Sequence, residues 1–336
     1  MSARVAVTGA TGFLGRHVVE HLLEQGHDVV AIARTPNSTE PDLTEGATFF
    51  RGDVQDPRSM DAALAGCESV IHCAGRVSRD PADADELHAL HVGGTKTVLD
   101  AAKRAGIRRA VVASTSGTVA VSENPKRILD ERAPSALPII ARWPYYRTKL
   151  FAEEAALERN SASFEVVVAS PTLLLGPGDF HGSSTGDVVD LLERRHPVLP
   201  GGGLSFVDAR DAAVGLALAL EVGQPGQRYL LAAQNLTLAE FARKIERLSG
   251  VRAPSMTLPA SLGLARAGAW LDKAVSKRLG GAPRMDRVSM EMAQYFWYVD
   301  ASKARRELGW EPRDPMVTLA DTVNDLLARG VAWPAA

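Results

Sequence analysis

A glycine-rich turn near the start of the chain, TGATGFLG, most constrains what this sequence can fold into. Gly9, Gly12 and Gly15 are spaced three apart, between an apolar run at 4–7 and a helical pattern at 16–25. Glycines between a strand and a helix let backbone N–H groups approach a pyrophosphate, and the helix N-terminus attracts the same anion. This placement favours a dinucleotide site over a purely structural turn.

Strand and helix patterns then alternate through the first 170 residues. Further strands are predicted at 27–34, 47–53, 69–75, 109–115 and 164–170, and helices at 57–65, 88–106 and 144–160. Strands such as VVAIA and EVVVAS are apolar on both faces, which a parallel sheet covered by helices on each side requires. The pattern predicts an α/β fold with a doubly wound parallel sheet.

The second half of the chain is less regular. The segments PTLLLGPGDFHG and HPVLPGGG are dense in Gly and Pro and are predicted as loops, and SFVDARDAAVGLALALE as a short strand leading into a helix. Helices are also predicted at 237–249, 260–279 and within 302–330. The 260–279 helix is basic and could lie on a membrane, but its small residues favour packing on its own domain.

Composition and charge exclude several classes of partner. The 336 residues include 38 Lys and Arg against 40 Asp and Glu, and a net charge of -2 gives no basis for nucleic-acid binding. The two cysteines, Cys67 and Cys73, lack CxxC spacing, so neither a disulfide framework nor a metal site is expected. No secretory leader pattern and no run of about 18 apolar residues occurs. We therefore expect a cytoplasmic protein without an integral membrane segment.

Candidate reactive side chains follow two of the predicted elements. The strand VVAST leads into three successive hydroxyls at Ser114, Thr115 and Ser116, where an α/β sheet presents its ligand crevice. The alternative is that these hydroxyls only cap the strand end. In YYRTK, Tyr145 is i,i+4 and Tyr146 is i,i+3 to Lys149, so helix geometry alone admits either tyrosine as the partner of the lysine.

Several motifs in order resemble the extended branch of the short-chain dehydrogenase/reductase superfamily, the NAD-dependent epimerase/dehydratase family. They are TGATGFLG, the GD at 52–53, HCAG, HVGGTKTVLDAA, VVASTS, YYRTK, SPTLLLGPGD, FVDARDAA and LGWEP. Within this branch, the motif STSGTV after the fifth predicted strand is most similar to that of the dihydroflavonol-4-reductase-like and 3β-hydroxysteroid dehydrogenase-like members. The resemblance implies a Rossmann domain at 1–170 that binds NADP(H). It also implies a mainly substrate-binding lobe at 171–336, with some segments returning to the Rossmann sheet.

The resemblance also implies roles for individual residues. The YxxxK spacing of the family selects Tyr145 and Lys149 as catalytic residues. The paired hydroxyls of the family select Thr115 as the third catalytic residue, with Ser116 as the second choice. The implied cofactor-binding residues are Gly9, Thr11, Gly12, Phe13, Leu14, Gly15, Arg34, Asp53, Val54, Cys73, Ala74, Gly75, Tyr145, Lys149, Pro171, Thr172 and Leu173. The family commonly has Asn where this chain has His91, which could preserve that role, alter a proton-relay water or simply pack.

The choice of dinucleotide depends on the end of the second strand. NAD enzymes place an acid there for the ribose 2′-hydroxyl, but this chain has Ala33 and then Arg34, whose guanidinium suits a 2′-phosphate. NADP(H) is therefore favoured, with NAD(H) possible and a solvated loop arginine as the alternative.

The substrate is expected to be an apolar ketone or aldehyde, reduced by hydride transfer with Tyr145 as proton donor, or the alcohol in reverse. Candidate substrate contacts are Arg76, Ser116, Trp143, Leu174 and Phe180. If Arg76 turns outward, it is an ordinary surface charge. The alternatives are an NDP-sugar epimerase or dehydratase with tightly held NAD(P), and a non-catalytic dinucleotide-binding regulator. The resemblance also allows a homodimer formed through the HVGGTKTVLDAA and YYRTK helices.

Overall fold

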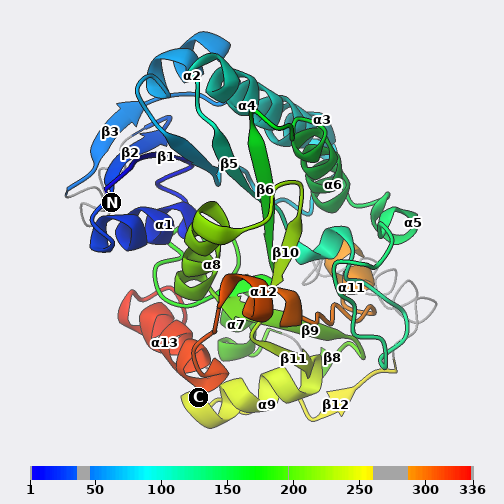
Figure 1. Cartoon of the computed structure of the whole chain (residues 1–336). Helices are drawn as coiled ribbons and strands as arrows, with labels where there is room; N and C mark the ends of the chain where they lie inside the picture. Colours follow the sequence, from blue (N-terminus) through cyan, green and yellow to red (C-terminus); the bar gives the residue numbers. More distant parts are fainter. Residues whose placement is uncertain (1, 36–45, 196, 260–286, 334–336) are drawn as a thin grey trace.

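A seven-stranded sheet forms the centre of the computed structural model, which describes residues 2–35, 46–195, 197–259 and 287–333 (Figure 1). The strand order is β10-β6-β5-β4-β1-β2-β3, and every neighbouring pair is parallel. The strands are β1 (Arg4–Thr8), β2 (Asp28–Ala33), β3 (Thr48–Arg51), β4 (Ser69–His72), β5 (Arg109–Ala113), β6 (Glu165–Pro171) and β10 (Arg228–Leu231). The predicted doubly wound α/β fold is confirmed.

Helices cover both faces of this sheet (Figure 1). One face carries α2 (Pro57–Ala63), α4 (Gly94–Arg104) and α6 (Pro144–Leu157), and the other carries α1 (Phe13–Glu24) and α8 (Ala209–Val222). Within β5, Val111 and Ala113 pack toward α8, whereas Ala110 and Val112 pack toward α4. This alternation explains why the centres of the strands are apolar on both faces.

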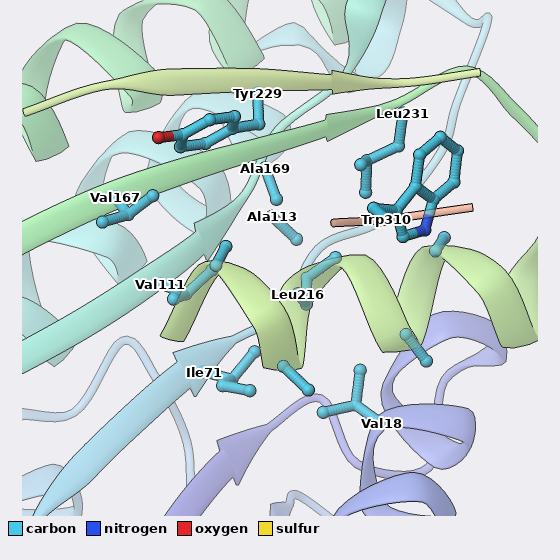
Figure 2. Packing of buried hydrophobic residues seen from close by; sticks show 14 of the residues in the cluster. Val18, Ile71, Val111, Ala113, Val167, Ala169, Leu216, Tyr229, Leu231 and Trp310 are labelled. Carbon is cyan, nitrogen blue, oxygen red and sulfur yellow. The ribbon is translucent and has the colours of Figure 1, made fainter. Parts of the chain in front are cut away.

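The core between the sheet and α8 continues into the C-terminal segment (Figure 2). Leu216 of α8 is fully buried beneath the strands, and Trp310 closes the cluster beside Leu231 of β10. The indole Nε1 of Trp310 donates a hydrogen bond to the carbonyl oxygen of Asp211 at 2.8 Å. Each fully buried large apolar side chain of this kind contributes about 1.5–3 kcal/mol to folding.

The second half of the chain forms a smaller sheet in the order β11-β9-β7. Its strands are β7 (Leu173–Leu175), β9 (Gly203–Asp208) and β11 (Gln234–Thr237), and α7 (Gly186–Leu192), α9 (Leu238–Ser249) and α13 (Pro315–Ala328) pack on it. A separate pair joins β8 (Val198–Leu199) to β12 (Met256–Thr257). The predicted loops PTLLLGPGDFHG and HPVLPGGG thus contain β7 and β8, because strands distant in sequence supply their pairing partners.

Other elements differ from the predicted pattern in their boundaries. The helix predicted at 88–106 is divided into α3 (Ala84–His88), a π-helical turn η2 (Ala89–Gly93) and α4. The remaining short elements are η1 (Pro81–Asp83), η3 (Ser116–Thr118), α5 (Leu137–Ile140), α11 (Arg287–Met292) and α12 (Ser302–Leu308). The helix predicted at 260–279 lies outside the described residues. Within the described ranges, no helix combines the length and apolar character needed to cross a membrane.

Candidate active site

The glycine turn after β1 needs glycine at two positions. Gly9 has a φ of +68°, and a Cβ there would lie 2.7 Å from the Cα of Ala74. A Cβ on Gly15 would lie 2.1 Å from the carbonyl oxygen of Gly9. The turn therefore holds the end of β1 against the chain that follows β4, and it lets α1 begin in close contact with β1.

The N-terminus of α1 fits an anion. Gly12 is its N-cap residue and makes no side-chain capping hydrogen bond, and the first turn has no acidic residue. The free N–H groups and the partial positive charge of a helix N-terminus suit the pyrophosphate of a dinucleotide. Thr11 and Leu14 are half-buried at this turn, and Phe13 is buried.

Two arginines mark the ends of β2 and β3. Arg34 directly follows β2 and is exposed, and its carbonyl oxygen accepts a hydrogen bond from Arg51 Nε at 3.2 Å. Arg51 ends β3 and is absent from the predicted site residues. The parallel pairing of β2 with β3 could have indicated it, because parallel neighbours end at the same edge of a sheet.

Asp53 and Val54 follow β3 at this edge. Asp53 Oδ1 accepts a hydrogen bond from the N–H of Gln55 at 2.9 Å, so Asp53 has the turn-capping role that its sequence context also allows. Val54 is buried against Gly94 of α4. This part of the sheet edge is thus rigidly packed.

The residues after β4 lie beside the glycine turn. Cys73 and Ala74 are half-buried and Gly75 is exposed, and burial raises the pKa of the Cys73 thiol to about 12. The preceding His72 is buried, with Nδ1 2.7 Å from Thr8 Oγ1 and Nε2 3.1 Å from Thr95 Oγ1. Burial, and to a lesser extent the charge of Lys149, lowers the pKa of His72 to about 3. His72 is therefore a neutral, hydrogen-bonded structural residue.

Lys149 lies against the end of β5. Its Nζ donates a hydrogen bond to the carbonyl oxygen of Ala113 at 2.6 Å, two residues before Thr115. Burial lowers the pKa of Lys149 to about 8, although Cys73 and Glu153 act in the opposite direction. Thr115 is half-buried, and its Oγ1 accepts a hydrogen bond from the N–H of Gly117 at 3.4 Å. The Thr115 hydroxyl therefore does cap the strand end. Because it accepts in this bond, its own proton stays available for donation.

The hydroxyls on either side of Thr115 have different surroundings. Ser114 Oγ donates to the buried Glu153 of α6 at 2.6 Å, and Thr118 Oγ1 donates to the same carboxylate at 3.1 Å. Glu153 also forms an ion pair with Arg228 of β10. Ser116 is buried at the start of η3. The sequence did not lead us to this network around Glu153. The signal that could have indicated it is a glutamate on the apolar face of a helix.

The two tyrosines at the start of α6 contact different neighbours. The Tyr145 ring meets the His91 ring edge-on, with centroids 5.7 Å apart and planes at 79°. The Tyr146 ring stacks on Trp297 at 4.8 Å and 30°, and a Cβ on Gly117 would lie 2.4 Å from Tyr146 Cε1. Both tyrosines are half-buried, and their rings contact each other with centroids 5.0 Å apart.

Burial keeps both phenols protonated at neutral pH. It raises the pKa of Tyr146 to about 12, and it raises the pKa of Tyr145 further, with an additional contribution from Tyr146. A nearby ammonium and an oxidised nicotinamide would both favour the phenolate and lower the pKa of Tyr145. In this structure Lys149 donates to the carbonyl oxygen of Ala113, and the cost of burying a phenolate raises the pKa of Tyr145.

The segment after β6 enters the smaller sheet. Pro171 ends β6, and the N–H and Oγ1 of Thr172 both donate to the carbonyl oxygen of Leu231, at 3.0 and 3.2 Å. Leu173 and Leu174 begin β7 and are half-buried. The predicted cofactor-binding residues Pro171, Thr172 and Leu173 thus connect the two sheets.

Three predicted substrate residues have well-defined partners. Arg76 makes ion pairs with Asp83 at 2.9 Å and Glu86 at 3.2 Å. The ring of Phe180 makes cation–π contacts with the guanidinium groups of Arg16 and Arg329, 4.5 and 4.8 Å from its centroid. Trp143 is buried and precedes α6, and its ring lies edge-on to Tyr146 with centroids 6.2 Å apart.

Trp297 stacks on Tyr146 of the candidate site, and the sequence did not indicate this contact. It lies 151 positions after Tyr146, next to an isolated bridge between Ser122 and Phe296, and no periodic pattern marks this segment. Tertiary pairing alone places Trp297 over Tyr146. Among the described residues, no cluster of three or more His, Cys, Asp or Glu side chains could hold a metal ion.

The glycine turn, the strand edge and the Tyr–Lys helix agree with a family-level match. Residues 5–232 match the family described as "NAD dependent epimerase/dehydratase family". The chain belongs to this family. It is thus an NAD(P)-dependent oxidoreductase of the extended short-chain dehydrogenase/reductase type, and the predicted resemblance is confirmed.

Two curated members of the family align over almost their whole length. The chain is 32% identical to the "Putative dihydroflavonol 4-reductase" of Synechocystis over 95% of this chain and 93% of that protein. It is also 32% identical to the "Sterol demethylase protein B" of Methylococcus capsulatus over 97% and 98% of the two chains. Among solved structures, gox2253 is 27% identical with a TM-score of 0.84 and covers 99% of this chain and 100% of that chain.

Proposed function

We propose that this protein is an NADP(H)-dependent reductase of a ketone or aldehyde on an apolar small molecule, or oxidises the alcohol in reverse. The observation that carries the proposal is the arrangement at the carboxyl end of β5. There the Nζ of Lys149 contacts Ala113, two residues before Thr115, and Tyr145 lies one helical turn before Lys149. This set of groups can bind and protonate a carbonyl oxygen.

Each residue has one role in this reaction. A bound nicotinamide supplies the hydride that reduces the carbonyl carbon. The Thr115 hydroxyl donates a hydrogen bond to the carbonyl oxygen, where negative charge develops. Tyr145 keeps its proton at neutral pH because its pKa is raised, and it gives that proton to the same oxygen, so that an alcohol forms. Lys149 supplies a positive charge beside the cofactor-binding edge of the sheet.

The packing of the two tyrosines supports Tyr145 as the proton donor. Tyr146 is fixed by its stack on Trp297 and by close contact with Gly117, as expected for a wall of the site. The adjoining rings of Tyr146 and Trp297 next to Tyr145 favour apolar substrates. Arg76 supports the same conclusion, because its charge is already compensated by Asp83 and Glu86.

A carbonyl-reduction assay tests the proposal. We expect the protein to oxidise NADPH in the presence of apolar ketones or aldehydes. Tyr145→Phe should lower kcat by at least about 100-fold while NADPH affinity is retained, because the transferable proton is lost. Tyr146→Phe is the matched control and should retain most of the activity, since its ring still stacks on Trp297.

Four outcomes would contradict the proposal. A Tyr145→Phe enzyme of near-normal rate, or an inactive Tyr146→Phe enzyme, would exclude Tyr145 as the donor. Conversion of a UDP-sugar with tightly retained cofactor and no net NADPH oxidation would identify a sugar-nucleotide epimerase or dehydratase. Cofactor binding with no turnover of either substrate class would identify a non-catalytic binding protein.

The preference for NADP(H) is supported by two arginines. Arg34 follows β2 and Arg51 ends the adjacent β3, where an NAD site needs an acid, and both are exposed. We expect Arg34→Ala to weaken NADPH binding by about 10-fold, as the loss of a charge-assisted phosphate contact would, and to leave NADH binding within about twofold. Kd values for both cofactors measure this. An equal effect on both cofactors, or a wild-type preference for NADH, would contradict it.

A further inference from the structure

His91 occupies an irregular turn of the helix that faces the candidate active site. It lies in the π-helical turn η2, between α3 and α4, and is 1% exposed. A π-turn inserts one extra residue per turn and often accompanies a functional site, because it redirects a side chain that regular helix geometry would place elsewhere. Here the turn directs His91 toward Tyr145 of α6.

Both imidazole nitrogens of His91 are hydrogen-bonded, and their partners determine the tautomer of the ring. Nε2 accepts a hydrogen bond from the backbone N–H of Arg76 at 3.2 Å. Since a backbone N–H can only donate, Nε2 carries no proton, and in the neutral ring the proton is on Nδ1. Nδ1 lies 2.9 Å from Thr148 Oγ1 and donates to it. The Thr148 hydroxyl in turn donates to the carbonyl oxygen of Pro144 at 2.8 Å.

This chain of hydrogen bonds cannot conduct a proton. It begins at a backbone amide and ends at a backbone carbonyl, and neither group exchanges protons on the timescale of turnover. Protonation of His91 would also place an imidazolium N–H against the N–H of Arg76. The charged and titratable groups around His91 oppose protonation too. Burial, together with Lys149 on α6, His72 on β4 and Arg76 after β4, lowers its pKa to about 3.

The same contacts connect two parts of the site. Through Arg76, His91 holds the segment after β4, and a Cβ on Gly75 would lie 3.4 Å from its Nε2. Through Thr148, it holds α6 one turn after Tyr145, and its ring edge contacts the Tyr145 ring directly. An asparagine at this position has a shorter side chain and no ring to contact the phenol.

We propose that His91 is a positioning residue: a neutral imidazole of fixed tautomer that joins the segment after β4 to α6 and holds the Tyr145 ring, without carrying a proton itself. The proposal rests on the proposed role of Tyr145 as proton donor. Its first test does not depend on any activity.

The tautomer can be measured by long-range ¹H–¹⁵N NMR of the full-length protein, with the His91 signal assigned by its loss in His91→Gln. We expect the Nδ1–H tautomer at every pH from 5.5 to 9. An imidazolium form or the Nε2–H tautomer in this range would overturn the proposal. If the wild-type protein reduces no carbonyl, the proposed function fails while this result still stands.

The kinetic test uses a matched pair of variants. Thr148→Val and Thr95→Val each remove a buried hydroxyl next to a buried neutral histidine, but only the histidine at Thr148 contacts Tyr145. We expect Thr148→Val and His91→Asn to lower kcat by about 10- to 100-fold through misplacement of the phenol, with much smaller changes in KM. Thr95→Val should keep the wild-type kcat.

The pH profile separates positioning from proton relay. In His91→Phe the ring remains and the nitrogens are lost, so kcat should fall while the shape of the kcat/KM profile stays that of the wild type. A profile that changes shape in His91→Phe would indicate that His91 carries a proton and would overturn the proposal. Full activity of His91→Asn, or an equal loss of kcat in Thr95→Val, would also overturn it.

Discussion

At the scale of single residues, burial determines the protonation of the candidate active site. Tyr145 and Tyr146 keep their protons because a buried phenolate is poorly solvated, and His72 and His91 stay neutral because a buried imidazolium is equally unfavourable. Of these five side chains, only Lys149, with a pKa lowered to about 8, changes its charge near physiological pH. The pH dependence of this region should therefore follow Lys149.

Cofactor affinity provides a direct test of the Lys149 charge. The ammonium is present below a pH of about 8 and is lost above it, so NADPH should bind more weakly as the pH rises from 8 to 9.5. The loss should be at most about tenfold per pH unit. Fluorescence titration of the free enzyme with NADPH between pH 6 and 9.5 measures this.

Lys149→Arg is the control for that titration, because arginine stays charged over the whole range. Its NADPH affinity should be flat across pH 8, whereas the wild type shows a decline. A wild-type affinity that does not change from pH 6 to 9.5 would show that the Lys149 charge does not contribute to binding.

Local spacing allowed part of this residue-level picture to be predicted. The positions of Gly9 and Gly15 follow from a turn between one strand and the next helix, and all the information lies within eight residues. The contact between Trp297 and Tyr146 involves chain segments far apart in sequence, so no spacing rule could indicate it. The pKa directions also depended on burial, which the sequence does not measure.

At the scale of elements, α6 is tied to the sheet by a buried charge as well as by apolar packing. Glu153 of α6 accepts hydrogen bonds from Ser114 and Thr118 next to β5, and it pairs with Arg228 of β10. The carboxylate is therefore fully satisfied although its side chain is 0% exposed. This arrangement fixes the helix that carries Tyr145 and Lys149 against the strand that leads to Thr115.

Removing the charge of Glu153 should be costly. Glu153→Gln leaves Arg228 without its buried counter-charge, so we expect the free energy of unfolding to fall by about 3–5 kcal/mol. Urea or thermal unfolding measures the loss. Glu154→Gln changes the exposed neighbour on the same helix and should alter stability by no more than about 0.5 kcal/mol. Equal effects of the two substitutions would show that the buried ion pair does not stabilise the fold.

The elements were predicted well where periodicity is strong and poorly where tertiary contacts decide. The valine-rich strands appear at the predicted places because their two apolar faces need helices on both sides. The π-turn at Ala89–Gly93 could not be predicted, because its residues continue an ordinary helical pattern. The short strands β7 and β8 were predicted as loops because only their distant partners make them strands.

At the scale of the whole molecule, the end of the chain completes the core of its beginning. Trp310 follows α12 and is 0% exposed, and it packs beside Leu231 and α8 in the cluster that also contains the first strands (Figure 2). Its indole donates to Asp211, next to the ion pair between Asp211 and Arg313. The two halves of the sequence therefore share one hydrophobic core.

The substitution Trp310→Ala tests how much the C-terminal segment contributes to the free energy of unfolding of the protein. We expect a loss of about 3–5 kcal/mol, because a large cavity opens in a fully buried cluster and the bond to Asp211 is lost. Trp333→Ala is the matched control, since that side chain is 74% exposed and should contribute less than about 0.5 kcal/mol. Unfolding of both variants at one temperature measures this, and a small loss for Trp310→Ala would contradict a shared core.

The parallel pairing of β10 with β6 also affects how this protein is made. Residues 228–231 form the last strand of the central sheet, so an emerging chain exposes one edge of β6 until they have been synthesised. An unpaired, apolar strand edge is a template for aggregation, and closing such a long loop is slow. A fragment that ends at residue 170 would keep that edge permanently and would lack Arg228 for Glu153. Residues 1–170 should therefore be studied only together with the strand at 228–231.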